Sequence, residues 1–139
     1  MSDTAARIGS EGSLETTMSR AVLVAALAAD EKLGQHTVVL DMEELLGVID
    51  AFVITSGRNV RQVKTLVEEI EAQVKADDGP SPLRIEGLHD GTWVLMDYGD
   101  FLVHVFVDEA RRYYDLERLW GNAPRRSVDG ALSDRGAED

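Results

Sequence analysis

The sequence has no cysteine, and its 14 lysines and arginines are far outnumbered by 26 aspartates and glutamates. Without thiols the chain has no disulfides, no thiol catalysis and no cysteine-ligated zinc or iron–sulfur centre. The net charge of −12 argues against binding nucleic acid through its phosphates, because such binding needs clustered basic side chains. An acidic chain favours a basic partner, although acidic charge serves solubility equally well.

Long apolar runs are also missing. The longest run near the start, AVLVAALAA at residues 21–29, is far shorter than the roughly 20 residues that a membrane span requires. No basic cluster precedes this run and no small-residue cleavage site follows it, so it does not have the pattern of a signal peptide. We therefore expect a cytoplasmic protein with no membrane partner.

The apolar share of 44% in 139 residues is ordinary for a globular protein and predicts one domain with one core. Both ends differ from the middle, because they are rich in small and polar residues and lack periodicity. We expect a flexible leader or remnant at residues 1–16, a folded domain at 17–120 and a flexible tail at 121–139.

Periodicity and capping residues define the expected elements. Thr17, Asn59 and Asp108 are placed to cap three helices that end near Leu33, Val74 and Trp120. Stretches rich in β-branched or alternating apolar residues predict strands at 36–42 and 49–56, a short edge strand within 82–87, and two strong strands within 93–107. The order α-β-β-α-β-β-β-α predicts an α/β domain with a mixed sheet.

The two strong strands join at Gly99 and Asp100, a pair that favours a two-residue type II′ hairpin turn. This turn fixes the register and separates two faces. The face expected to meet the helices carries Val94, Met96, Tyr98, Phe101, Val103 and Val105. The opposite face carries Trp93, Leu95, Asp97, Leu102, His104 and Phe106.

This second face is largely apolar but contains an aspartate and a histidine, which are costly to bury without partners. If the two long helices cover the core side, the second face stays partly open, and an open aromatic patch usually marks a docking site. The alternative is that the final helix covers the face, with Asp97 pairing with His104 or capping a turn.

Catalytic motifs are weak. His104 and Asp97 resemble a base and its orienter, yet no nucleophile motif accompanies them, and Ser56 lacks the glycine-framed turn of hydrolases. Asp97 and Asp100 diverge and do not form a metal pair. The loop TSGRN at 55–59 joins a strand to a helix start, where phosphates often bind, but it lacks the Walker lysine. We expect no enzyme, no cofactor and no metal, with a nucleotide-binding or nucleotidyltransferase-like enzyme as the alternative.

Three segments, IDAFVITSGRNVRQV at 49–63, WVLMDYGDFLVHVF at 93–106 and EARRYYDLERLW at 109–120, resemble in order and spacing the ribosomal silencing factors, also called Iojap-like proteins. The resemblance implies a nucleotidyltransferase-like scaffold, and the Asp-x-Asp pair that would hold catalytic magnesium does not follow TSGRN here. It implies a non-enzymatic translation repressor, acting in starvation or slow growth and possessing a homodimeric free state.

The implied partner is the large ribosomal subunit, bound through its basic protein L-fourteen with little direct nucleic-acid contact, so that joining of the small subunit is sterically blocked. On this hypothesis Asp97 faces basic partner groups, Asp100 closes the turn and His104 supports the patch. The partner-binding residues predicted in this way are Trp93, Leu95, Asp97, Tyr98, Asp100, Leu102 and His104. A protein-interaction adaptor with a non-ribosomal partner is a third hypothesis.

Overall fold

A computed structural model describes residues 19–128, in which the strands form one mixed sheet in the order β3-β4-β5-β2-β1-β6. Within this part of the chain β2 and β5 are parallel, and every other neighbouring pair is antiparallel. The predicted α/β class with a mixed sheet is confirmed. The strands are β1 (Gln35–Asp41), β2 (Ala51–Gly57), β3 (Arg84–Glu86), β4 (Trp93–Asp97), β5 (Phe101–Val107) and β6 (Arg125–Ser127).

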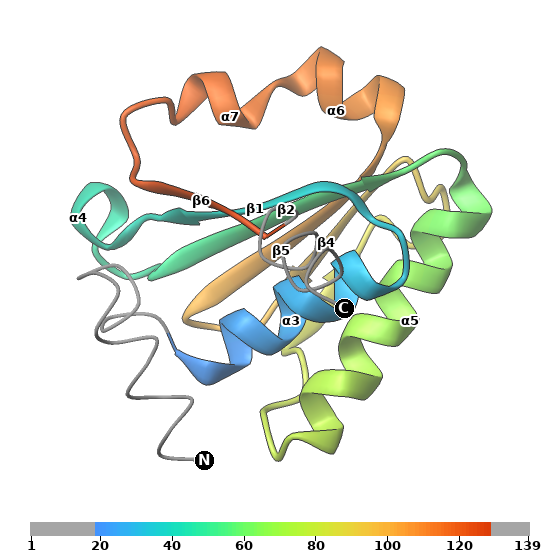
Figure 1. The fold of residues 1–139 in the computed structure, drawn as a ribbon, viewed down its shortest axis with the longest axis horizontal. Coiled ribbons are helices and arrows are strands. Elements are labelled where there is room, and N and C mark those ends of the chain that lie inside the picture. Colours follow the sequence, from blue (N-terminus) through green and yellow to red (C-terminus); the bar gives the residue numbers. More distant parts are fainter. Residues whose placement is uncertain (1–18, 129–139) are drawn as a thin grey trace, which may run out of the picture.

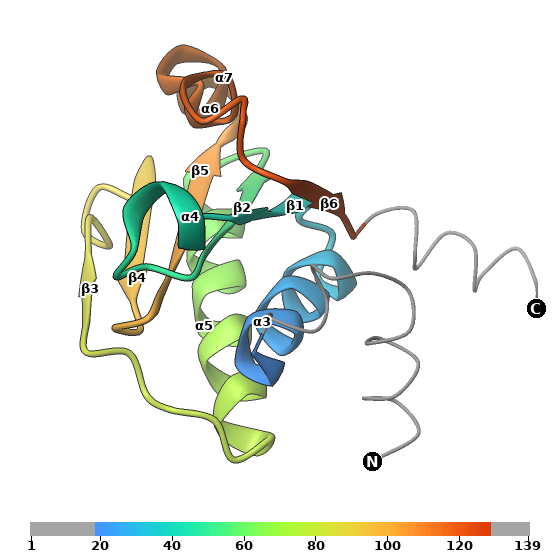
Figure 2. The same ribbon diagram turned by 90° about the vertical axis from the view of Figure 1, so that its left-hand side faces the viewer.

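The helices lie on both faces of the sheet. The two long helices, α3 (Arg20–Glu31) and α5 (Val60–Ala76), cover one face, whereas α6 (Asp108–Tyr114) and α7 (Leu116–Leu119) cross the other (Figures 1 and 2). The short helix α4 (Glu43–Leu46) lies at one end of the strands and connects β1 to β2 (Figure 1). No helix in residues 19–128 is long and apolar enough to cross a membrane.

Capping side chains set where the two long helices begin. Asn59 Oδ1 accepts a hydrogen bond of 2.9 Å from the backbone N–H of Gln62, which confirms Asn59 as the cap of α5. The cap predicted for the first helix was wrong. That helix begins at Arg20, and Ser19 Oγ accepts from the N–H of Val22 at 3.3 Å in place of Thr17.

The main core lies between the sheet and the two long helices. Small residues of α3 allow a close approach to the sheet, and α5 adds the apolar stripe that its sequence predicts. All six hairpin residues predicted for the core side are buried here, which confirms the assignment of that face. The helix residues of this core include Ala25, Ala26, Ala29, Val63, Leu66, Val67 and Ile70.

Three elements depart from the prediction. The four residues of α4 are too few to show a helical period. The final helix divides at Asp115, whose left-handed backbone (φ 51°, ψ 53°) separates α6 from α7. The predicted tail contains β6, which pairs with β1, so ordered structure continues beyond Trp120 to Val128. The predicted leader and the remainder of the tail lie outside the described residues.

Candidate docking surface

The β4–β5 hairpin has the predicted register, with Trp93 opposite Phe106, Leu95 opposite His104 and Asp97 opposite Leu102. Gly99 adopts a positive φ of 96°, as the first central residue of a type II′ turn requires, and the N–H of Tyr98 donates to the carbonyl of Phe101 at 3.0 Å. This turn fixes which side chains share a face. We use the name hairpin face for the partly exposed side chains on the side away from α3 and α5, namely Trp93, Leu95, Asp97 and Leu102.

Trp93 is the largest side chain of the hairpin face, and rings from two other elements hold it in place. Its centroid lies 5.0 Å from that of Phe106 on β5 and 4.5 Å from that of Tyr114 on α6. Its indole N–H donates to Nδ1 of His104 at 3.2 Å. The ring is therefore fixed while part of its surface remains exposed.

His104 lies beneath Trp93 and is only 5% exposed. Its ring meets that of Phe52 edge-on at 4.7 Å, and burial lowers the pKa of its imidazole to about 4. Since Nδ1 accepts the indole bond, the neutral ring carries its proton on Nε2, which has no hydrogen-bond partner among the described residues. His104 supports Trp93 from below, whereas the sequence placed it at the exposed patch.

Asp97 finds its partners locally. Its Oδ1 accepts from the backbone N–H of Gly99 at 2.9 Å, and its Oδ2 lies 3.3 Å from Nε of Arg84. The predicted role of Asp97 as a turn cap is confirmed. The alternative prediction, that Asp97 pairs with His104, was wrong, because His104 Nδ1 bonds Trp93. Asp100 is exposed at the tip of the turn, where its carbonyl accepts from the N–H of Asp50 at 2.7 Å.

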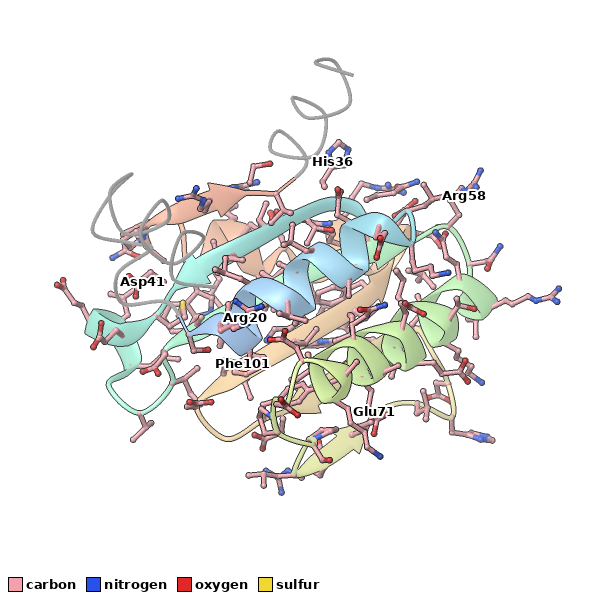
Figure 3. The ribbon with its side chains drawn as sticks, turned by 60° about the horizontal axis from the view of Figure 1, so that its bottom comes forward. Arg20, His36, Asp41, Arg58, Glu71 and Phe101 are labelled. Carbon is pink, nitrogen blue, oxygen red and sulfur yellow. The ribbon has the colours of Figure 1, made fainter. Side chains whose placement is uncertain are left out.

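The inclusion of Tyr98 among the partner-binding residues is contradicted by its position. Its side chain lies on the opposite face and stacks on Phe101 with ring centroids 4.6 Å apart. Burial, with a further effect from Glu71, raises the pKa of its phenol to about 12. Figure 3 views the molecule from this side, where Phe101 and Glu71 are labelled. Strict alternation along β4 makes Tyr98 a core residue, so it cannot meet a partner that binds the hairpin face.

The second face is covered only in part. Ala110, Leu116 and Trp120 from the α6–α7 segment pack against a smaller apolar cluster that includes Phe52 and Phe106. The alternative prediction, that the final helix covers this face, is therefore correct for part of the face. It leaves Leu95, Leu102 and the outer side of Trp93 partly exposed, as the docking interpretation requires.

Arg111 is a buried residue that the sequence pattern does not single out. Its guanidinium donates to both carboxylate oxygens of Glu117 at 3.0 and 2.9 Å and to Ser56 Oγ at 3.1 Å. It also donates to the carbonyls of Gln35 and His36, both at 2.7 Å. Arg111 thus ties α6, which carries Tyr114, to β1, β2 and α7. In the sequence it is one of two adjacent arginines and has the pattern of a solvated cation.

Several polar groups of the TSGRN loop form hydrogen bonds with other residues of the protein. Thr55 Oγ1 lies 2.8 Å from Thr37 Oγ1, Ser56 Oγ accepts from Arg111, and the N–H of Arg58 donates to the side-chain carbonyl of Gln62 at 2.8 Å. Figure 3 shows the Arg58 side chain pointing outward at the same end of the molecule as His36. No group of three potential metal-ligating side chains occurs in residues 19–128.

The structure is a mixed α/β domain in which a fixed, partly exposed tryptophan lies beside partly exposed leucines. Apolar surface of this kind is common at macromolecular binding sites. The family model described as "Ribosomal silencing factor during starvation" matches residues 15–139. The chain belongs to this family, and the resemblance noted in its sequence is confirmed.

Individual relatives agree with this assignment. The chain is 41% identical over 110 residues to the ribosomal silencing factor RsfS of Bacillus subtilis, covering 79% of this chain and 92% of that protein. It is 33% identical over 92 residues to the mouse protein named "Mitochondrial assembly of ribosomal large subunit protein 1", covering 64% of this chain and 39% of the mouse protein.

Two solved structures have the same fold. A crystal structure of a Chromobacterium violaceum protein matches with a TM-score of 0.70 and 33% identity, covering 75% of this chain and 88% of the other. A crystal structure from Bacillus halodurans matches with a TM-score of 0.66 and 33% identity, covering 77% of this chain and 96% of the other.

Proposed function

We propose that this protein is a cytoplasmic ribosomal silencing factor. It binds the large ribosomal subunit through the basic ribosomal protein L-fourteen, sterically blocks joining of the small subunit and represses translation during starvation or slow growth. The observation that carries the proposal is the family match over residues 15–139. The name of the mouse relative, which refers to assembly of the large subunit, supports the choice of subunit.

The hairpin face is the surface that we assign to the partner. Tryptophan is among the residues that most often dominate binding energy, because its large ring excludes water over a wide area. Trp93 is already held between Phe106 and Tyr114, so little side-chain freedom is lost when a partner covers it. Leu95 and Leu102 extend the apolar surface beside it.

Charge complementarity supports a basic partner. The chain carries a net charge of −12, and Asp100 is exposed at the tip of the hairpin. Opposite potentials accelerate association and orient the two surfaces, and both effects weaken as salt is added. Association with the large subunit should therefore slow with rising ionic strength, with a smaller effect on dissociation.

The geometry favours binding over catalysis. A general base needs a second group to orient it and a reacting group within reach. His104 is buried and accepts from Trp93, while Asp97 is committed to Gly99 and Arg84. The two side chains that resembled a catalytic pair therefore serve the hairpin itself, and we propose a role without chemistry.

Co-sedimentation with purified large and small subunits tests this function. The unaltered protein should pellet with the large subunit alone. Trp93→Ala should lose about 2 kcal/mol of binding free energy, equal to about a 30-fold weaker affinity, which is the scale of an interface hot spot. Leu95→Ser is a second variant, since Leu95 is partly exposed and less tied to the core.

Leu27→Ala is the matched control, because Leu27 is a partly exposed apolar residue on α3, which covers the opposite face. Thermal unfolding of each variant establishes that it is folded. Unchanged affinity in folded Trp93→Ala and Leu95→Ser would place the interface elsewhere. We also propose that the free protein is a homodimer, which light scattering tests separately.

A further inference from the structure

The segment from Asp41 to Asp50, which contains α4, exposes apolar side chains that serve no core. Val48 is 80% exposed and Leu46 is 37% exposed, and Leu45 is similar to Leu46. The segment is nevertheless anchored, because Met42 is fully buried at its start and Ile49 packs against the second apolar cluster at its end. Exposed apolar residues on an anchored segment are a common feature of interaction sites.

The charges around these apolar residues have one sign. The segment DMEELLGVID contains Asp41, Glu43, Glu44 and Asp50 and neither lysine nor arginine. Glu43 and Glu44 are exposed on α4 itself, and Figure 3 labels Asp41 beside this helix. The apolar residues are thus framed by carboxylates, which favours a partner with basic groups around an apolar centre.

The α4 segment is continuous with the hairpin face. The N–H of Asp50 donates to the carbonyl of Asp100 at the hairpin turn, at 2.7 Å. Ile49 and Leu102 pack against the same apolar cluster, so the two surfaces share an underlying support. Figure 2 shows α4 at the strand ends, between the β4 side of the sheet and the α6–α7 segment.

We infer that Leu45, Leu46 and Val48 form a second contact for the same basic protein partner that the hairpin face binds. This inference rests on the proposed function and adds a contact that the hairpin does not supply. A second copy of this segment is disfavoured as the occupant, because two such segments facing each other would bring eight carboxylates together around the apolar residues. A homodimer of the free protein would then use another surface. An anionic membrane surface is disfavoured for the same reason.

The test compares two double variants in the co-sedimentation assay. Leu46→Ser combined with Val48→Ser removes side chains that are 37% and 80% exposed, and Leu27→Ser combined with Leu33→Ser removes side chains that are 38% and 70% exposed on and just after α3. The first pair should weaken binding to the large subunit about tenfold, whereas the second should leave it unchanged. Both pairs should stay folded, since these side chains are exposed.

Glu43→Lys combined with Glu44→Lys tests the contribution of the α4 carboxylates to binding. This variant should weaken binding to the large subunit more at low salt than at high salt.

If the Leu46 and Val48 variant binds as tightly as the unaltered protein while Trp93→Ala binds weakly, the α4 contact is refuted and the hairpin interface stands. If that variant changes only the mass of the free protein in light scattering, the segment is a self-association surface and the inference is wrong. If the unaltered protein does not bind the large subunit, both proposals fail.

Discussion

Protonation of His104 should destabilise the folded protein in a defined pH range. Burial holds the pKa of this imidazole at about 4, against an ordinary value near 6.5 in the unfolded chain. The unfolded state therefore binds a proton more readily, so stability is complete above pH 6.5 and falls as the pH decreases toward 4. Each pH unit between the two pKa values lowers the free energy of unfolding by about 1.4 kcal/mol. The total loss is roughly 3 kcal/mol, of which roughly 1 kcal/mol has occurred by pH 5.5.

Urea unfolding at pH values from 5 to 7.5 measures this loss. The lowered pKa of the Glu117 carboxyl, beside Arg111, adds its own loss only as the pH falls below the ordinary glutamate value of 4.5, so the range above pH 5 isolates the histidine. His104→Phe keeps a ring beside Phe52 and should make stability nearly independent of pH in this range. His89→Asn, at an exposed histidine, should leave the dependence unchanged. A His104 imidazole that titrates near 6.5 by NMR in the folded protein would refute the reasoning.

Two further predictions concern stability. Arg111→Met should lower the free energy of unfolding by about 2–3 kcal/mol, because the carbonyls of Gln35 and His36 lose their donor and Glu117 keeps only the exposed Arg125 as an ionic partner. A loss below 1 kcal/mol in urea unfolding would show that the Arg111 contacts contribute little. Asn59→Ala should cost about 1 kcal/mol through loss of the α5 cap, whereas Asn59→Asp should retain the cap. Equal thermal unfolding temperatures for Asn59→Ala and Asn59→Asp would contradict the assigned role of the side-chain oxygen.

The hairpin was predictable because residues close together in the sequence determine its turn and its register. A glycine and an aspartate at the turn set the register, and alternation then assigns each side chain to a face. The same alternation places Tyr98 in the core, so its prediction as a partner-binding residue was inconsistent with the alternation. The cap at Asn59 is local in the same way, since it lies within three residues of its partner.

The features that the sequence did not predict depend on contacts between distant segments. Arg111 meets the carbonyls of Gln35 and His36, more than 70 residues away, and its own surroundings resemble an exposed helix. The strand β6 has only three residues, two of them arginine, and its pairing with β1 defines it. The partial cover of the hairpin face depends on the left-handed Asp115, which redirects the chain between α6 and α7.

A subunit-joining assay tests the proposed steric block of small-subunit joining. Purified large and small subunits are mixed at a magnesium concentration that supports joining, with the protein added before the small subunit, and joined ribosomes are separated on a sucrose gradient. Joined ribosomes should decrease as the protein saturates the large subunit, whereas an equal concentration of Trp93→Ala should leave joining nearly intact. Full joining in the presence of large subunits saturated with the protein would contradict a steric block and would reduce the proposal to binding alone.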